Sequence, residues 1–393
     1  MYRSWKRTAF RAGCALTSLA ALSACGGGTT GGVNSTPTPP PVSPPPPPPP
    51  PLPPPPPTAS FDTAEYRRSN GAVQAKAITG YNAGATGAGV KVAVIDSGVA
   101  QSNAEFSGRI DPASADLAGS RGIGDEGGHG TAVSDVLLGA KNDSGIHGVA
   151  FGATLLVART DTPGSCTTTD PNQGCSHDDN AIARGVDLAV ANNARVINIS
   201  LGGSPPNSTL RSALSRATAA GIIIVFSAGN DASVDPDPFA QIANDPLARN
   251  LIIIAGALDA SNAALASFSN KAGNGAIHYL GALGENVRAI DQTGTSFLWS
   301  GTSFSAPIVS GAVALLAQAF PNLTGAQIVD LLFRSADDIG AAGVDPIFGN
   351  GALDLAKAFG PQGPLLNGHK LVLPALPNPL TAADAARLRG HAD

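Results

Sequence analysis

The sequence predicts an α/β fold with a mainly parallel central sheet and helices on both of its faces. Runs of β-strand character alternate with runs of helical character between about residues 90 and 320. The strand runs are continuously apolar, as in VINIS and IIIVF, which is typical of strands buried on both faces. Alternation of such strands with helices predicts a parallel sheet that is covered on both sides. In such folds, ligands bind beyond the carboxyl ends of the strands.

The predicted elements follow one another closely. The first strand, 90–95, is an apolar run that ends at Asp96, and apolar residues at helical spacing follow Gly130. The last helix is long and apolar, and it contains Pro307, which a helix tolerates near its first turn. The elements after the helix at Gly130 are, in order, strand 155–160, helix 180–194, strand 196–202, helix 209–220, strands 222–229 and 251–258, and helix 303–320.

Three short motifs place an aspartate, a histidine and a serine in that order. They are VIDSG with Asp96, GGHGTA with His129 and GTSFSAP with Ser303. A serine hydroxyl is a weak nucleophile at neutral pH, so it needs a base to accept its proton and a third group to orient that base. Taken singly, Asp96 could end a buried strand and His129 could cap a helix. Their joint occurrence, each at the edge of a predicted element, favours a nucleophilic site, and the N–H groups of a helix start would favour an oxyanion there.

The motifs and their order resemble those of the subtilisin-like serine proteases, the subtilases, from about Ala85 to Phe359. The resemblance implies a three-layer subtilisin-like fold and a serine endopeptidase that works through an acyl-enzyme. Ser303 would attack the peptide carbonyl, His129 would carry the proton and Asp96 would orient His129. The stretch YNAGATGAGVKVAVIDSG also resembles the catalytic passenger domain of autotransporter-type bacterial subtilases.

Further segments match family positions that contact the substrate. IIIVFSAGN ends at Asn230, and the resemblance assigns its side-chain amide to the oxyanion hole together with the N–H of Ser303. The same Asn could be an ordinary turn residue. The resemblance places the substrate between Ser200, Leu201 and Gly202 on one side and Ser227, Ala228 and Gly229 on the other. The first segment would pair with the substrate backbone as an extended strand and the second would line the pocket for the residue before the scissile bond, which predicts a broad sequence preference.

The sequence departs from the family pattern at several points. Ala132 stands where many relatives have a second histidine that is not a member of the triad, so we expect only the local packing to differ. GALG, 281–284, stands where many relatives have a turn with the sequence APG, so the resemblance does not define the floor of the substrate pocket here. KNDSG, 141–145, resembles the calcium-binding loop region of the family but is shorter. No cofactor is expected to be required, and calcium is an open alternative that the sequence does not predict.

Composition restricts the class of partner. Of the 393 residues, 13% are charged, the formal net charge is −5 and there is no basic patch, so nucleic acid is not an expected partner. The expected partners are protein or peptide substrates. One catalytic domain, 61–360, is the expected organisation, followed by a tail, 361–393, and the chain is expected to be a monomer.

Residues 1–24 are interpreted as a lipoprotein-type signal peptide. Basic residues among the first eleven positions precede a short apolar stretch, 14–24, which is too short for a stable membrane span. LSAC then resembles a bacterial lipobox, which implies lipidation of Cys25 and attachment to a membrane through it. An ordinary signal peptide with Cys25 as a spare thiol is the alternative. The prediction is an exported bacterial protein held at the cell envelope, on the outer membrane or the cell surface, with release of the domain as a further option.

Residues 25–60 are predicted to be a disordered stalk. A Gly-rich stretch leads into a proline run, 37–57, which favours stiff polyproline II and cannot form a core. At about 3.1 Å per residue the run would reach about 65 Å. A ligand for proline-binding modules is the alternative interpretation.

Two cysteines remain free to pair if Cys14 leaves with the signal peptide and Cys25 carries lipid. Cys166 and Cys175 lie in one polar loop and are predicted to form a disulfide, as is typical of exported proteins. Nearby His177, Asp178 and Asp179 raise a metal-site alternative, but their spacing matches no usual zinc pattern, so no metal site is predicted. The histidines expected on the surface or in loops are His147, His278, His369 and His391.

The sequence therefore predicts an exported, lipid-anchored serine endopeptidase. Two other functions stay open. A non-catalytic peptide-binding module could use the same fold, although all four chemical positions are filled. An enzyme activated by a partner or by trimming is the second, because residues 58–89 are too few for the folding prodomain that secreted subtilisins usually carry.

Overall fold

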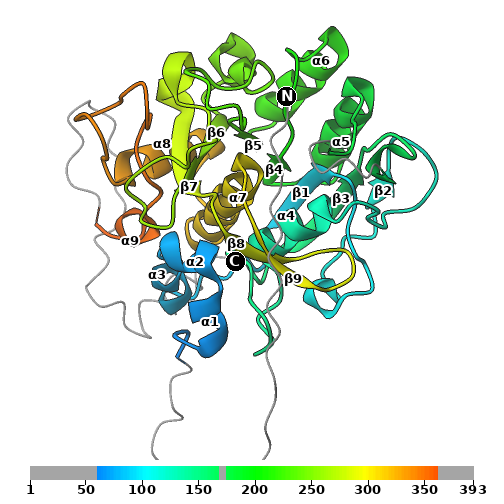
Figure 1. Cartoon of the computed structure of the whole chain (residues 1–393), viewed down its shortest axis with the longest axis horizontal. Coiled ribbons are helices and arrows are strands. Elements are labelled where there is room, and N and C mark those ends of the chain that lie inside the picture. The colour runs from blue at the N-terminus through cyan, green and yellow to red at the C-terminus, as the bar shows by residue number, and fades with distance from the viewer. Residues whose placement is uncertain (1–59, 168–173, 362–393) are drawn as a thin grey trace, which may run out of the picture. The chain divides into compact units, whose positions relative to one another are not determined.

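The computed structural model describes residues 60–167 and 174–361 (Figure 1). The predicted signal peptide, the lipidation site Cys25, the proline run and the tail from residue 362 onward lie outside the described residues. His369 and His391 lie outside them as well.

A seven-stranded sheet forms the centre of the domain, in the order β2-β3-β1-β4-β5-β6-β7. Every neighbouring pair of these strands is parallel. The strands are β1 Lys91–Asp96, β2 Ala115–Asp116, β3 Thr154–Arg159, β4 Val196–Ile199, β5 Ile223–Ser227, β6 Ile252–Leu258 and β7 Tyr279–Leu283. The predicted α/β fold with a parallel sheet is confirmed. Because β1 lies between β3 and β4, it delivers Asp96 to the middle of the carboxyl edge.

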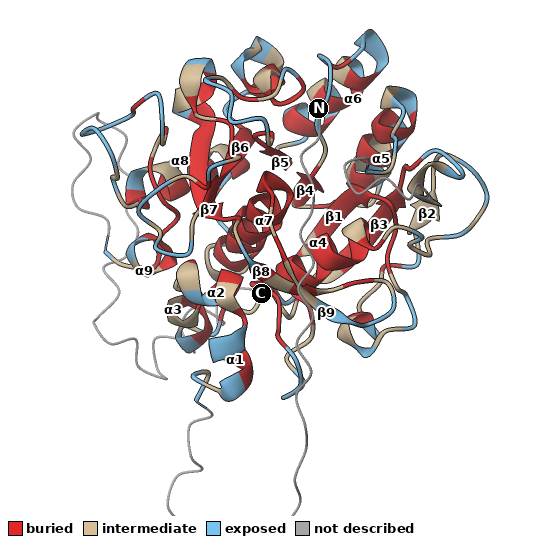
Figure 2. Cartoon of the chain, viewed as in Figure 1, coloured by how far each residue is buried: buried red, intermediate tan, exposed pale blue. Residues whose placement is uncertain are grey.

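Each face of the sheet has its own apolar core. In β1, Val92 and Val94 belong to one core, with residues of α4 and α7, whereas Ala93 and Ile95 belong to the other, with residues of α5 and α6. This alternation follows from the two-residue period of a strand. The long helices are α4 His129–Leu138, α5 Asp179–Ala191, α6 Ser208–Ala219, α7 Thr302–Ala319 and α8 Gly325–Ser335. Figure 2 shows that the strands and α7 are mostly buried.

Helix α7 is the longest of these helices and is mostly buried. By length and composition alone it could cross a membrane, but 83% of its 18-residue window is buried inside the domain. It packs on the sheet between α4 and α8, with residues such as Ile308 and Leu315 in the core. Its apolar character therefore belongs to the core of the domain.

Several elements were not predicted from the sequence. They are the short helices α1 Ala64–Arg68, α2 Asn70–Gln74, α3 Ile78–Asn82 and α9 Leu355–Ala358, the longer helix α8, the strands β2 and β7, the 3₁₀ helices η1 Ala104–Phe106, η2 Ser165–Thr167, η3 Ala240–Asn244, η4 Pro246–Ala248 and η5 Gly273–His278, and the antiparallel hairpin of β8 Val287–Ile290 and β9 Ser296–Trp299. GALG, which stands in place of the family's APG turn, is mostly strand, because its first three residues complete β7, paired with β6.

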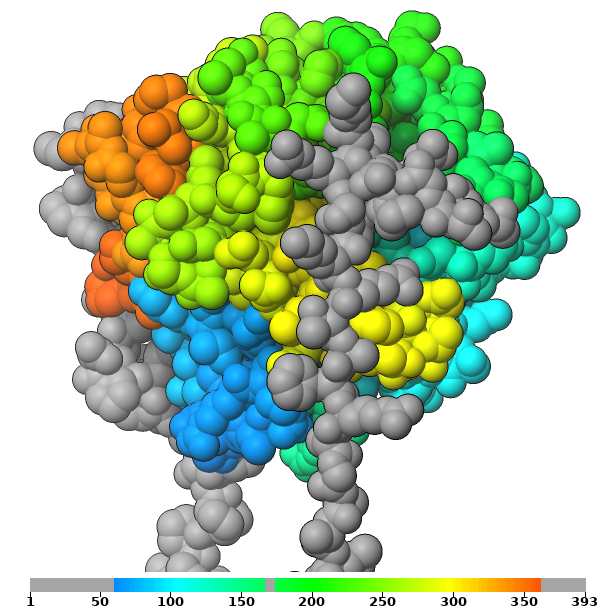
Figure 3. Space-filling view, viewed as in Figure 1, coloured from blue at the N-terminus to red at the C-terminus, as the bar shows by residue number. Residues whose placement is uncertain are grey.

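The N-terminal helices lie beside the β8-β9 hairpin, as blue and yellow surfaces in Figure 3. Asn70 fixes this contact, since its Nδ2 donates to the carbonyl of Asn286 at 2.8 Å and its Oδ1 accepts from the N–H of Arg288 at 3.0 Å. The N-terminal helices are thereby joined to the segment that leads into α7.

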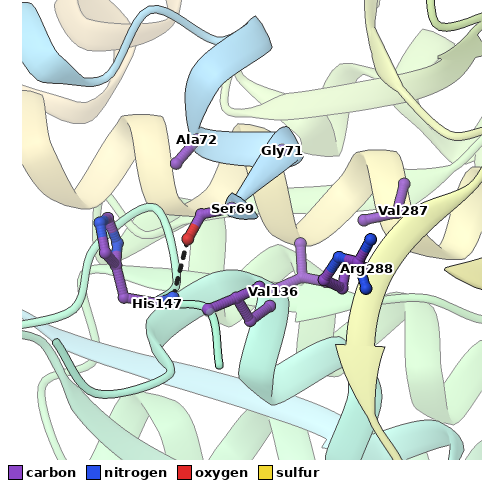
Figure 4. A pocket seen from close by; sticks show the side chains of 8 residues that line it. Ser69, Gly71, Ala72, Val136, His147, Val287 and Arg288 are labelled. Carbon is purple, nitrogen blue, oxygen red and sulfur yellow. Dashed lines mark hydrogen bonds between the residues drawn. The ribbon is translucent and has the colours of Figure 1, made fainter. Parts of the chain in front are cut away.

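A pocket lined by Ser69, His147 and Arg288 lies at the same junction (Figure 4). His147 lies in a loop, as predicted, and His278 ends η5, but neither is a surface residue, because they are only 2% and 8% exposed. The ring of His147 stacks on Tyr66 with centroids 5.9 Å apart, and its backbone N–H donates to Ser69 Oγ at 2.8 Å. Its ring packs among aromatic side chains far away in the sequence, which sequence inspection does not reveal.

The buried ring of His147 should make the free energy of unfolding depend on pH in the acid range. Burial lowers the pKa of His147 below its ordinary value of 6.5, although the Gly148 carbonyl and Glu65 favour the charged ring. Below pH 6.5 the unfolded chain therefore binds more protons than the folded chain, and the free energy of unfolding falls as the pH drops through the folded-state pKa. We expect His147→Phe to remove this part of the pH dependence. Urea unfolding at about pH 7 and pH 5 gives the free energy of unfolding at each pH. An equal change in this free energy between the two pH values in the wild type and in His147→Phe would contradict the assignment.

Candidate functional site

Asp96, His129 and Ser303 come from the end of β1, the start of α4 and the first turn of α7. His129 Nδ1 lies 2.8 Å from Asp96 Oδ1. The ring of His129 lies edge-on to the ring of Phe304, with centroids 5.9 Å apart, and Phe304 directly follows Ser303. The structure therefore joins Asp96 to His129 at the carboxyl edge of the sheet and places Phe304, the residue after Ser303, against the ring of His129.

Exposure differs along this trio. The side chain of Asp96 is 1% exposed, whereas that of His129 is 21% exposed. Ser303 is 6% exposed. A buried carboxylate is thus followed by an imidazole that reaches the surface, which is the arrangement needed to exchange a proton with a bound molecule.

Electrostatics couple Asp96 and His129. Burial by itself favours a raised pKa for Asp96, but the charge of His129 and its hydrogen bond outweigh burial and lower the pKa. For His129, burial favours a lower pKa, and the charge and hydrogen bond of Asp96, with a further contribution from Asp125, raise the pKa above 6.5. Because Nδ1 donates to Asp96, Nε2 of the neutral ring is the nitrogen that can accept a proton.

Asp125 is a site residue that the sequence analysis missed. Its carboxylate accepts from Ser97 Oγ at 2.9 Å, from the Gly128 N–H at 2.9 Å and from the Thr131 N–H at 2.8 Å. It therefore holds the loop before His129 and the first turn of α4. The available signal was an acidic residue just ahead of a helix start, where carboxylates accept free N–H groups.

Asn230 is joined to the start of α7. Its Oδ1 accepts from both the N–H and the Oγ1 of Thr302, each at 2.9 Å. Because the oxygen is held by Thr302, the Nδ2 group on the opposite side of the amide is oriented as a donor. The N–H of Ser303 belongs to the first helical turn, which has no earlier turn to accept it. The structure thus brings two predicted donors to one end of α7.

The two predicted substrate segments follow adjacent strands. Ser200, Leu201 and Gly202 follow β4, and Ser227, Ala228 and Gly229 end β5 and continue it. Leu201 is partly exposed and Gly202 exposed, whereas Ser227 to Gly229 are buried. Ser227 Oγ donates to the carbonyl of Leu201 at 3.0 Å and ties the segments together. Gly229 has φ +104°, and a Cβ there would lie 2.3 Å from Asn270 Nδ2, so only glycine fits.

Asp237 also links these segments and was not predicted. Its Oδ1 accepts from the N–H of Gly203 at 2.8 Å, and its own N–H donates to the carbonyl of Ala228 at 2.7 Å. The two sides of the predicted substrate cleft are thus joined at a second point.

The predicted disulfide between Cys166 and Cys175 is present. It packs against the loop that leads to His129, since a Cβ at Gly127 would lie 2.9 Å from Cys175 Sγ. The neighbouring residues diverge: His177 Nδ1 lies 2.9 Å from Thr160 Oγ1, Asp178 Oδ1 accepts from the Asn180 N–H, and Asp179 Oδ2 accepts from the Asn207 N–H. Among the residues that the structure describes, no group of three or more His, Cys, Asp or Glu side chains could hold a metal ion.

Loss of the disulfide is expected to reduce stability. Replacing both Cys166 and Cys175 with Ser should lower the free energy of unfolding by about 2 to 3 kcal/mol, because the short loop is no longer closed in the unfolded chain. Denaturant unfolding of the double variant measures this, and a reductant should affect the wild type but not the variant. Equal stability of the oxidised wild type and the variant would contradict the prediction.

Comparisons with known proteins agree with this geometry. The family model described as the Subtilase family matches residues 87–351. Subtilisin DY of Bacillus licheniformis is 31% identical over 257 residues, which are 65% of this chain and 87% of that protein. Subtilisin Savinase of Lederbergia lenta is 30% identical over 288 residues, which are 73% of this chain and 97% of that protein. The narrower resemblance to autotransporter passenger domains stays a prediction. The chain belongs to the subtilase family and is a serine-type endopeptidase.

Proposed function

We propose that this endopeptidase cleaves peptide bonds through an acyl-enzyme formed on Ser303, with His129 as the base and Asp96 as its partner. The observation that carries the proposal is the 2.8 Å contact between Asp96 Oδ1 and His129 Nδ1, beside the turn of α7 that bears Ser303. Beside such a pair a serine can act as a nucleophile, because the imidazole accepts its proton and the carboxylate orients the imidazole.

Acylation begins as Ser303 Oγ attacks the peptide carbonyl carbon and its proton moves to His129 Nε2. The C–N bond then breaks and the imidazolium returns the proton to the leaving amine. A water molecule, deprotonated by His129, then attacks the acyl carbon, the bond to Ser303 Oγ breaks, and the imidazolium returns the proton to Ser303 Oγ as the acid is released. Asp96 stays ionised throughout and holds His129 in the tautomer whose Nε2 faces the reaction.

Asn230 Nδ2 and the Ser303 N–H would hold the oxyanion of the tetrahedral intermediates. Both donors are fixed before the substrate binds, since Thr302 holds Asn230 and α7 holds Ser303. Fixed donors are effective because they need no reorganisation as the charge develops.

We expect Asn230→Ala to lower kcat by about 100- to 1000-fold with little change in KM, a magnitude established on subtilisin itself. The charge to be stabilised exists only in the transition state, so the loss should fall on kcat. Steady-state kinetics on a peptide substrate measure both constants. A change confined to KM would assign Asn230 to substrate binding instead.

The substrate would be a protein or peptide lying between the segments that begin at Ser200 and at Ser227. Leu201 and Gly202 are accessible and follow a strand, which suits backbone pairing with an extended chain. Pairing through the backbone supports a broad sequence preference. We propose that a single domain, 61–360, acts in this way as a monomer.

We also propose that the protein is exported and held at the cell envelope through lipid on Cys25. The disulfide supports export, because such bonds persist in oxidising compartments. The lipobox-like LSAC sequence supports the anchor. Metabolic labelling with a fatty-acid analogue, lost in Cys25→Ser, would test it, and an unlabelled wild type would contradict it.

Asn142, in the loop 141–145, links two carboxylates. It donates its N–H to Glu65 Oε1 at 2.9 Å and its Nδ2 to Glu105 Oε1 at 3.2 Å. The second oxygen of each carboxylate is buried and has no hydrogen-bond partner. Calcium takes about six to eight oxygen ligands, more than these two carboxylates supply, so we propose no calcium site, and no step of the reaction needs one.

Pre-steady-state kinetics would separate an enzyme from a peptide-binding module on the same fold. The proposal predicts a burst of nitrophenol from a nitrophenyl ester, close to one equivalent of the enzyme, followed by slower turnover as the acyl-enzyme is hydrolysed. A folded chain that shows neither a burst nor turnover would favour the binding module or an enzyme activated by a partner. Activity that appears only after limited trimming would favour activation by processing.

A further inference from the structure

A line of buried hydrogen bonds reaches Ser303 from the interior of the domain. Ser310 Oγ donates to Asn198 Oδ1 at 3.0 Å, and Asn198 Nδ2 donates to Ser200 Oγ at 2.9 Å. Ser200 Oγ then donates to the backbone carbonyl of Ser303 at 2.8 Å. Ser310 and Asn198 are 0% exposed and Ser200 is 2% exposed, so water does not compete for these bonds.

Pro307 explains why the carbonyl of Ser303 needs a partner from outside its helix. Within an α-helix this carbonyl would accept from the N–H four residues later, but Pro307 has no N–H. A buried carbonyl without a partner is costly. The hydroxyl of Ser200 takes the place of the missing donor.

The direction of each bond in the line is determined. The Ser200 hydroxyl gives its only proton to Ser303, so toward Asn198 it can only accept. Asn198 must then direct its Nδ2 toward Ser200, which leaves its Oδ1 facing Ser310. The Ser310 hydroxyl donates to that oxygen and so fixes the orientation of the amide.

Ser200 holds Ser303 at two points. Besides the bond to the carbonyl, Ser303 Oγ itself donates to the backbone carbonyl of Ser200 at 3.3 Å. A shift of Ser200 would therefore move both the backbone and the hydroxyl of Ser303. The side chain of Ser200 is buried, so its hydroxyl acts toward α7, while contact with a substrate is left to its backbone.

We propose that Ser200, Asn198 and Ser310 are positioning residues for the nucleophile Ser303, and that Ser310 acts through the other two. The inference rests on the proposed function, in which Ser303 is the nucleophile. A nucleophile must be held close to its attack geometry, and a displacement of about 1 Å can cost about 100-fold in rate. The line of bonds supplies this restraint at the point where Pro307 interrupts the helix.

The test compares Ser200→Ala and Ser310→Ala with Ser310→Thr, which keeps a hydroxyl, and with Ser305→Ala as the matched control. Ser305 is as buried as Ser310 and lies on the same helix, but its hydroxyl donates to the carbonyls of Ala282 and Leu283. We would measure kcat and KM on one peptide substrate, the rate of labelling by a fluorophosphonate and the unfolding temperature of the purified full chain.

We expect Ser200→Ala to lower kcat and the labelling rate by about 10- to 100-fold and Ser310→Ala by about 3- to 10-fold, each with KM within about twofold. Ser310→Thr should restore most of the loss, and Ser305→Ala should match the wild type. Ser310→Ala changes the least structure, so it keeps the test decisive if Ser200→Ala does not fold.

Several outcomes would overturn the inference. Wild-type kcat in both alanine variants would do so while leaving the proposed function intact. An equal loss in Ser305→Ala would assign the effect to packing in α7, and a rise in KM alone would assign it to substrate binding. A folded wild type that neither labels nor cleaves would refute the proposed function and the inference with it.

Discussion

Ser303→Ala is expected to lower kcat for peptide hydrolysis by about a millionfold while the chain stays folded, a magnitude known from subtilisin itself. Ser303 Oγ is the atom that forms the acyl bond in the proposed mechanism, and Ser303 precedes Phe304, whose ring lies against His129. The residual rate would come from the oxyanion donors and from substrate binding.

The control for this prediction compares the two single variants, Ser303→Ala and His129→Ala, with the double variant. Because Ser303 and His129 act as one unit, His129→Ala should cost about as much as Ser303→Ala, and the double variant should cost little more than either. The kinetics of the three variants on one peptide, with circular dichroism to check folding, measure this. Independent losses that multiply in the double variant would contradict a shared step.

Asp96→Asn is expected to lower kcat by about ten-thousandfold, because an amide does not hold the neutral imidazole in the reactive tautomer. The variant should also change the pH profile. The charge of Asp96 raises the pKa of His129, so its removal should lower that pKa. The base is active only when neutral, so the acid limb of kcat/KM should lie above pH 6.5 in the wild type and move to lower pH in the variant.

Asp125→Asn is the comparison that separates charge from orientation. Asp125 also raises the pKa of His129, but less than Asp96 does, and no hydrogen bond from it to His129 contributes. It should therefore shift the acid limb slightly in the same direction, with a loss in kcat smaller than that of Asp96→Asn, because the remaining amide oxygen keeps part of the contacts that hold the first turn of α4. An acid limb that stays in place in Asp96→Asn would show that the pair does not operate as described.

The parts of the fold that were predicted are those with a strong local signal. The five strands from β1 to β6, apart from β2, are continuous apolar runs, and helices α4 to α7 have long apolar patterns. Helices α1 to α3 are five residues each, too short to show a helical period. The strand β7 was missed because its glycine and alanine resemble a turn, and only pairing with β6 makes it a strand.

The candidate site was predictable where motifs carry the chemistry and not where the supporting contacts lie far apart in the sequence. Asp96, His129 and Ser303 each stand in a recognisable motif. The residues that hold them in place lie far from them in the sequence. Ser200 and Ser303 are 103 residues apart, and Asn230 and Thr302 are 72 apart. Such pairs meet only because parallel strands bring their carboxyl ends to one edge.

Covalent labelling of the purified, folded chain with a fluorophosphonate probe tests the central claim most directly. The account predicts one label per chain, located by mass spectrometry on the peptide that contains Ser303, absent in Ser303→Ala and strongly slowed in His129→Ala. A folded wild type that remains unlabelled, or a label that persists in Ser303→Ala, would contradict the claim that His129 and Asp96 activate Ser303.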